Sequence, residues 1–202
     1  MAVLKREFYS GNTLLVGQKL LGKRVVRALD GEILSGVINE TEVYFGMDDS
    51  ASHASRGITP RNKIMFGPPG VAYIYFVYGM HYMLNIVTEK EGTPAAVLIR
   101  SVVPMQRIQR MEILRGNKRR ALTDGPAKLC QALAIDTSFN GWDVTRGVTL
   151  WIEDFADVKQ EFIESGPRVG IPYANKKDKE ALRRFWIGKE RLHQLANKGK
   201  IR

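Results

Sequence analysis

Hydrophobic and polar residues alternate along much of the chain, which is the pattern of half-buried β-strands. One predicted β-hairpin turns at Asp30-Gly31, because Asp-Gly between alternating segments is a strong turn signal. A second predicted hairpin turns at Gly79-Met80 and is rich in β-branched and aromatic residues. The strands that this pattern predicts are residues 23–29, 32–44, 71–78, 81–88, 95–103, 149–154 and 182–188.

Three helices are predicted between and after these strands. The first covers residues 13–21, with Asn12 or Thr13 as its N-cap and Gly22 as its stop signal. The other two each carry a proline in the first turn, where the missing N–H costs nothing. They are residues 104–116, starting at Pro104, and residues 125–135, with Pro126 at the start.

The order of these elements predicts an α+β fold. The 202 residues contain no internal repeat and no low-complexity linker, and this length suits one ordinary domain. We therefore expect a single compact domain over residues 1–202, with a central antiparallel or mixed, curved β-sheet, a protruding β-hairpin and surrounding helices. Residues 47–70 are expected to form a long loop, and a basic C-terminal tail is expected from about residue 190.

Composition narrows the class of protein. Hydrophobic residues make up 44% of the chain, enough to build a core, so a disordered or collagen-like chain is excluded. The single cysteine, Cys130, excludes a disulfide framework and fits a reducing compartment. No apolar run approaches the roughly 20 residues that span a bilayer, and no secretory signal is recognisable. We expect a soluble, intracellular protein with no membrane partner.

The net charge of +10 is concentrated in two regions. Residues 176–202 carry ten Lys or Arg against three Asp or Glu, and residues 107–120 carry six against one. The rest of the chain is nearly neutral. Such regions favour a polyanionic partner, with DNA or RNA as the leading candidate. The alternative is that they are a solvated tail and a charged helix face.

The chain lacks the sequence motifs of metal sites, nucleotide-binding sites and serine hydrolases. The three histidines, His53, His81 and His193, are scattered without metal-ligand spacing, so no metal is expected. No glycine-rich phosphate loop and no GxSxG elbow are present, which leaves a nucleotide cofactor and a serine nucleophile unsupported. We expect no cofactor.

One acidic segment stands out in this basic chain. Residues 40–49 (ETEVYFGMDD) hold four carboxylates and no basic residue. Strand alternation places Glu40, Glu42 and Tyr44 on one face. A carboxylate beside an aromatic ring in a cleft is a candidate general base, because burial can move its pKa. The alternative is that Glu42 pairs with a nearby arginine and has only a structural role.

Tyrosines gather around the second predicted hairpin. Tyr73 and Tyr75 share one face of their strand and are candidates to line a pocket. Tyr78 falls just before the predicted turn, where a core ring is not expected. An exposed ring at a hairpin tip has the shape of the wedges that some proteins insert between DNA base steps.

Six segments in a fixed order carry a resemblance to a known family: ETEVYFG, ASHASRGITPRNKIMF, YIYFVYGMHYMLNIV, VLIRSVVP, GPAKLCQALAI and RVGI. Together they resemble the alkyladenine (3-methyladenine) DNA glycosylase family, in the form of a bacterial-type single-domain member. The resemblance runs from about residue 8 to about residue 190. It implies a monofunctional enzyme that removes alkylated or deaminated purines from double-stranded DNA and leaves an abasic site, without metal or nucleotide.

The resemblance also implies roles for individual residues. Glu42 matches the general base that activates water, and Arg100 and the backbone carbonyl of Ile187 match groups that hold this water. A sandwich around the extruded base is implied for Tyr44, His53 and Tyr75. Asn85 matches a residue that screens purines by clashing with the guanine amino group. The remaining implied roles are filling the gap in the duplex, by Tyr78 with Met80 beside it, and contacting the DNA backbone, by Arg61 and Asn62.

Two other classes of protein remain as alternatives. A non-catalytic module that binds single-stranded nucleic acid would explain the basic regions and the tyrosines. It leaves the acidic segment unexplained, because carboxylates beside a phosphate groove weaken binding. A glycoside hydrolase would use two carboxylates of residues 40–49, but it does not explain the net charge. We expect a monomeric glycosylase, because a single domain that acts on a single lesion does not require a symmetric oligomer.

Overall fold

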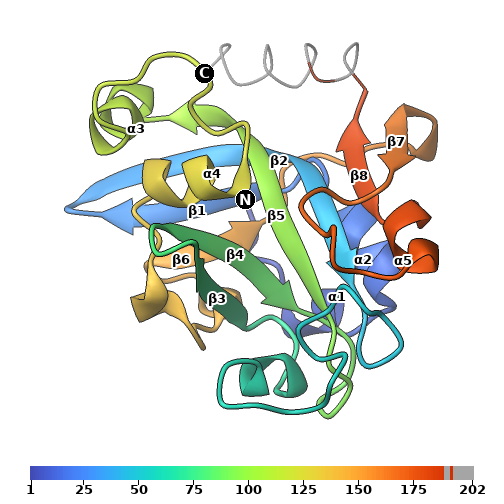
Figure 1. The fold of residues 1–202 in the computed structure, drawn as a ribbon. Coiled ribbons are helices and arrows are strands. Elements are labelled where there is room, and N and C mark those ends of the chain that lie inside the picture. The colour runs from blue at the N-terminus through green and yellow to red at the C-terminus, as the bar shows by residue number, and fades with distance from the viewer. Residues whose placement is uncertain (189–191, 193–202) are drawn as a thin grey trace.

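The computed structural model describes residues 1–188 and residue 192, so the expected basic tail lies outside the described residues. Within them, eight antiparallel strands form a curved, unclosed sheet with five α-helices around it (Figure 1), which confirms a single compact α+β domain. The strands are β1 (Arg24–Leu29), β2 (Glu32–Tyr44), β3 (Ala72–Val77), β4 (His81–Val87), β5 (Ala96–Gln106), β6 (Leu150–Glu153), β7 (Ile163–Gly166) and β8 (Arg184–Ile187). The helices are α1 (Arg6–Tyr9), α2 (Thr13–Lys19), α3 (Ile108–Leu114), α4 (Pro126–Ala132) and α5 (Lys176–Glu180).

Strand β2 organises the sheet. One of its edges pairs with β5, and the other pairs with β1 along its first half and with β8 along its second half. The strand order is β3-β4-β5-β2-β1-β6, and β7 pairs with β8. The register between β2 and β5 shifts on both sides of Glu40, and such bulges re-aim side chains. The acidic end of β2 is therefore held from both sides in the middle of the sheet.

The two faces of β2 have different neighbours. On one face, Thr41 Oγ1 donates a hydrogen bond of 2.9 Å to the Gly17 carbonyl oxygen of α2. A Cβ added to Gly17 would lie 2.5 Å from Val43 Cγ2, so only glycine lets the helix approach this closely. Figure 1 shows α2 behind the sheet and α4 in front of it. Glu42 and Tyr44 alternate with these residues and so face away from α2.

Both predicted hairpins are present. Asp30 and Gly31 have φ values of 51° and 76°, which is the geometry that the Asp-Gly signal predicts. The second turn is centred on Tyr78-Gly79, with φ values of 53° and 66°, one residue earlier than predicted. Met80 N–H donates to the Val77 carbonyl oxygen at 3.1 Å and closes this turn. The tyrosine ring therefore projects from the tip of the hairpin.

Helices α2 and α4 begin where the sequence predicted. Asn12 Oδ1 accepts hydrogen bonds from the N–H groups of Leu14 and Leu15, so Asn12, rather than Thr13, is the N-cap of α2. Pro126 is the first residue of α4.

No helix in the described part of the chain is long and apolar enough to cross a membrane.

The predicted helix start at Pro104 is wrong. Pro104 lies within β5, which continues to Gln106, and α3 begins only at Ile108. Pro104 pairs with Gly36 next to a register shift, and the β4 pairing of β5 covers only Ala96 to Leu98. A strand tolerates proline at such an unpaired edge or bulge, because no ladder hydrogen bond is lost there.

Two small clusters of buried side chains lie beside the main core and support the walls of a cavity. The first lies against the long loop of residues 47–70 and packs against Tyr75; it contains Ala54, Met65, Tyr73, Val87 and Ala96. The second packs against Tyr44 and contains Ala51, Ile171 and Ala174. Rings from different strands are thereby fixed around a shared opening.

Candidate active site

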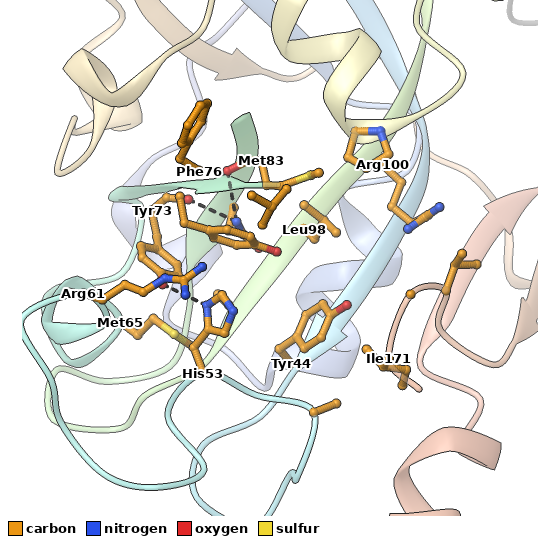
Figure 2. A pocket seen from close by; sticks show the side chains of 18 of the residues that line it. Tyr44, His53, Arg61, Met65, Tyr73, Phe76, Met83, Leu98, Arg100 and Ile171 are labelled. Atoms are coloured by element: carbon orange, nitrogen blue, oxygen red, sulfur yellow. Dashed lines mark hydrogen bonds between the residues drawn. The ribbon is translucent and has the colours of Figure 1, made fainter. Parts of the chain in front are cut away.

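A cavity of about 500 Å³ opens on the face of the sheet opposite α2. This volume lies in the usual range for sites that bind small molecules or single chemical groups. Figure 2 shows side chains from several strands and loops pointing into it. The candidate residues that line it are Tyr44, His53, Arg61, Tyr75, Tyr78, Asn85 and Arg100, joined by Tyr73, Val169 and Tyr173.

Glu42 is a completely buried carboxylate next to this cavity. The hydroxyl of Tyr44 donates to its Oε2 at 2.9 Å, and the N–H of Val169 donates to its Oε1 at 2.7 Å. Arg100 Nη1 lies 3.1 Å from the same Oε1. Burial raises the pKa of Glu42 above the ordinary carboxyl value, although these three neighbours each act to lower it. The carboxylate is thus fixed in orientation and suited to accept a proton.

Arg100 joins two of the four carboxylates of the acidic segment. Its Nε donates to Glu40 Oε1 at 2.9 Å, while its Nη1 faces Glu42. Glu40 Oε1 also accepts a hydrogen bond of 3.2 Å from Arg184 Nη1. The expected shared face of Glu40, Glu42 and Tyr44 is confirmed by these contacts. Glu42 therefore pairs with an arginine, and it lies behind the cavity lining, to which all three of its donors belong.

Aromatic rings form two opposed sides of the cavity. His53 and Tyr75 meet edge to face with ring centroids 4.5 Å apart, and Tyr73 lies 5.4 Å from Tyr75. Figure 2 shows Tyr44 across from His53. Burial lowers the pKa of His53 to about 4, and its Nδ1 lies 2.9 Å from the Tyr73 hydroxyl. A neutral imidazole and tyrosine rings thus offer stacking surfaces to a planar group.

Asn85 lies in β4 at the inner wall of the cavity and is buried. Its Nδ2 donates to the carbonyl oxygens of Tyr73 at 3.1 Å and Met83 at 3.2 Å, as the dashed lines in Figure 2 show. These bonds fix the orientation of the amide. A rigid amide at this place can discriminate between planar groups by shape and by hydrogen bonding.

The tip of the β3–β4 hairpin lies at the rim of the cavity. The ring of Tyr78 is 83% exposed and still lines the opening, and Met80 is 62% exposed. A single large apolar side chain with this exposure is common on protein surfaces. Two of them on one protruding turn form a local apolar surface. The predicted exposure of Tyr78 at the tip is confirmed.

Arg61 and Asn62 have different environments. The guanidinium of Arg61 lies 5.4 Å from the Tyr75 ring centroid and lines the cavity. Asn62 is buried, and its Nδ2 donates to the carbonyl oxygens of His53 and Gly57. Its side chain therefore holds the loop together, and the contact of this segment with a DNA backbone stays a prediction.

Ile187 does not join the described cavity lining. It pairs with Ile163 at the end of β8, whereas Arg184, three residues earlier, is the residue opposite Glu42. The backbone N–H that donates to Glu42 belongs to Val169, and the role of the Ile187 carbonyl as a water ligand stays a prediction. Val169 and Gly170 belong to the RVGI segment. Gly170 has a φ of 81°, a conformation that favours glycine, and the backbone of this segment lines the cavity.

Sequence reasoning also missed Tyr173. Its ring is 66% exposed at the mouth of the cavity, and its hydroxyl donates to the Ala51 carbonyl oxygen at 3.1 Å. The bond ties the two loops on this side of the cavity to each other. Among the described residues, no group of three or more His, Cys, Asp or Glu could hold a metal ion.

Comparison with known proteins identifies the family. Residues 7–191 match the family model for methylpurine-DNA glycosylase. A protein of Chlorobaculum parvum is 49% identical over 173 residues, which cover 85% of this chain and 82% of the relative. A protein of Methanocella arvoryzae is 46% identical over 185 residues, with 91% and 90% covered. Both relatives are provisionally named 3-methyladenine DNA glycosylase. The chain therefore belongs to the methylpurine-DNA glycosylase family of DNA-repair enzymes.

Proposed function

We propose that this protein binds double-stranded DNA at a damaged purine, turns the damaged nucleotide out of the duplex and hydrolyses its N-glycosidic bond. The substrates we propose are 3-methyladenine, 7-methylguanine, hypoxanthine and ethenoadenine, and the product is an abasic site. The observation that carries this proposal is the buried Glu42 carboxylate, held by three donors beside an aromatic cavity. Chemistry on a base inside a duplex requires that the base leave the stack.

Glu42 is the proposed general base. It accepts a proton from a water molecule while the water oxygen bonds to C1′ of the sugar and the glycosidic bond breaks, so that the base departs with the bonding electrons. The carboxylate also faces the positive charge that develops on the sugar. Arg100 helps to hold the water. We propose a backbone carbonyl of the loop at Val169 as a second water ligand, because this loop lines the cavity and Ile187 is not among the described lining residues.

The cavity is the proposed binding site for the extruded base. Tyr44 on one side and His53 with Tyr75 on the other stack on its two faces. Base–aromatic stacking contributes about 1–3 kcal/mol per base, comparable to the cost of unstacking, so a weakened lesion pair is favoured. Asn85 selects against undamaged guanine by a clash with its exocyclic amino group, a cost that 7-methylguanine also bears and that its weakened glycosidic bond offsets.

Tyr78 and Met80 are proposed to fill the space that the base vacates in the duplex. Their exposure at the tip of a hairpin beside the cavity supports this role. The residues described as lining the cavity include no lysine, which supports hydrolysis by water over a Schiff-base intermediate. We propose that the enzyme is monofunctional, acts as a monomer and works inside the cell, where the DNA is.

The two alternatives fit the site less well. A non-catalytic binding module has no use for a buried carboxylate that is held by three donors. A glycoside hydrolase needs two carboxylates on either side of its substrate. Glu40, the other carboxylate that Arg100 contacts, is engaged by Arg100 and Arg184 and shares a strand face with Glu42, so the two do not lie on opposite sides of a substrate.

A base-release assay tests the proposed function. A duplex with one hypoxanthine, and separately methylated genomic DNA, are incubated with the protein and then divided. One half is treated with alkali and the other is not. We expect strand breaks only after alkali, which report abasic sites made by a monofunctional enzyme. Breaks without alkali would contradict the monofunctional mechanism, and salt-sensitive binding without base release would favour the non-catalytic module.

A further inference from the structure

Arg168 occupies a completely buried position behind the candidate active site. Its Nη1 donates to the Val43 carbonyl oxygen at 2.9 Å and to Asp49 Oδ2 at 2.6 Å. Its Nη2 donates to Asp49 Oδ1 at 2.8 Å and to the Asp178 carbonyl oxygen at 3.3 Å. The guanidinium thereby joins the end of β2, the loop that follows β2, and helix α5.

The same guanidinium lies against Tyr44. Its central carbon is 4.7 Å from the centroid of the ring, which is a cation–π contact. Tyr44 lines the cavity, and Arg168, whose side chain has no exposed area, lies behind it. The tyrosine is thus held in the orientation in which its hydroxyl donates to Glu42 Oε2.

The second donor to Glu42 is Val169, the residue that follows Arg168 in the chain. Val169 N–H donates to Glu42 Oε1 at 2.7 Å, and Arg168 fixes the backbone from which this N–H projects. Each carboxylate oxygen of Glu42 therefore has a hydrogen-bond donor that depends on the position of Arg168. The bidentate pair with Asp49 fixes the guanidinium more strictly than a single contact could.

We propose that Arg168 is a positioning residue for the Glu42 carboxylate, which it serves by holding Tyr44 and Val169 and by contributing a buried positive charge. This inference rests on the proposed function, in which Glu42 is the general base. It also gives a role to Asp49, the residue of the acidic segment that anchors the guanidinium. Lysine at this position would keep the charge but lose the fork of donors.

The pH dependence of base release separates this role from a purely structural one. Loss of the positive charge and disorder of the two donors each favour the protonated carboxyl, so the pKa of Glu42 rises and its ionised fraction falls. Glu42 and Arg168 interact electrostatically in the folded protein. The variants keep all the other groups that face Glu42, and only Tyr44 among them is expected to move. These groups are Arg100 on β5, Tyr44 and Glu40 on β2, Arg184 on β8 and Tyr75 on β3.

The experiment measures single-turnover base release from a hypoxanthine duplex as a function of pH for the wild type, R168M and R168K. R24M is the matched control, because Arg24 also forms a largely buried ion pair, with Glu153, but between β1 and β6. Affinity for the lesion duplex and thermal unfolding are measured on the same samples. These readouts separate a change in chemistry from a loss of binding or folding.

We expect R168M to release the base about 10–100-fold more slowly at neutral pH, since small displacements of a catalytic group cost this much. Its acid limb should lie at higher pH than that of the wild type, and its affinity for lesion DNA should stay within about threefold. R168K should be slower with its acid limb nearly unmoved. R24M should lose stability while its acid limb and its rate per folded molecule stay unchanged.

An unshifted acid limb and a wild-type rate in folded R168M would overturn the proposal while leaving the proposed function intact. If R168M does not fold, R168K decides, and a wild-type rate in that variant would overturn the proposal. Absence of base release by the wild type would instead contradict the proposed function, and the role of Arg168 would fall with it.

Discussion

A buried carboxylate such as Glu42 is stable only where donors replace the water that it has lost. Tyr44, Val169 and Arg100 supply these donors, and each of them also borders the cavity. The donors that compensate for the lost hydration of the Glu42 carboxylate are thus the same groups that fix its orientation. At the scale of single residues, stability and chemistry use the same contacts.

The first prediction concerns Tyr78. Replacement of this exposed ring by alanine removes the surface that would fill the gap in the duplex. Affinity for a lesion duplex should fall by at least about fivefold, which corresponds to the lower end of 1–3 kcal/mol for base–aromatic stacking. Base release from single-stranded lesion DNA should change less, because no gap has to be filled there.

Gel-shift titration and single-turnover kinetics on both substrates measure this difference. V148A, which truncates an apolar side chain of 56% exposure in another part of the molecule, is the control and should behave as wild type. Equal losses of Y78A on duplex and single-stranded substrates would contradict the wedge role.

Alternation along a strand identified several of the site residues before any coordinates. Glu42 and Tyr44 lie two positions apart, as do Tyr73 and Tyr75, and each pair meets on one face as predicted. Strand alternation does not specify the surroundings of two other candidates. Asn62 is bonded within its own loop, and Ile187 pairs with Ile163.

At the scale of elements, the close approach of α2 to β2 sets the position of the strand that carries Glu42. Gly17 allows this approach, because no side chain separates the helix from Val43. The Thr41 hydroxyl, which donates to the Gly17 carbonyl oxygen, fixes the register of the contact. The helix thus supports the face of β2 that is opposite Glu42.

Gly17→Ala tests this contact. The added Cβ would meet the stiff, β-branched Val43 at 2.5 Å, so we expect a loss of about 1–3 kcal/mol in the free energy of unfolding. Higher helix propensity of alanine, about 1 kcal/mol, offsets part of this loss. Urea unfolding measures it, with L15A on the exposed side of α2 as the control. A G17A protein more stable than wild type would contradict the packing described here.

The elements that sequence reasoning missed are short or irregular. Helices α1 and α5 have four and five residues, too few for a hydrophobic period to appear. Strand β7 also has only four residues and is defined by its pairing with β8. Pro104 misled the prediction of a helix start because the signal for a helix is local, whereas the bulge that accepts the proline is set by β2.

At the scale of the whole molecule, the positive charge of the segment between α3 and α4 is expected to bind DNA phosphates. Lys118, Arg119 and Arg120 are exposed on the segment that leads into α4, whose first residue, Pro126, lines the cavity. Within the described part of the chain, these three side chains form no ion pair. Unpaired cations beside a DNA site can bind phosphates without first breaking internal contacts.

The double variant R119A/R120A should therefore bind lesion and undamaged DNA more weakly by a similar factor. The slope of log affinity against log salt should fall by about 2, at roughly 0.9 per lost phosphate contact. Fluorescence anisotropy at several salt concentrations measures this. K5A/K19A removes the same charge from the region of α1 and α2 and should leave the slope unchanged. An unchanged slope in R119A/R120A would place the DNA footprint elsewhere.

The central claim is that Glu42 performs the chemistry, and base release by Glu42→Gln tests it most directly. A duplex with one hypoxanthine is incubated with wild type and variant under single-turnover conditions, and alkali-labile sites are counted. Lesion affinity and thermal unfolding are recorded in parallel. We predict release at background level by E42Q, with an affinity within a few fold of wild type, because the stacking and wedge surfaces remain. Near-normal release by a folded E42Q protein would contradict the account.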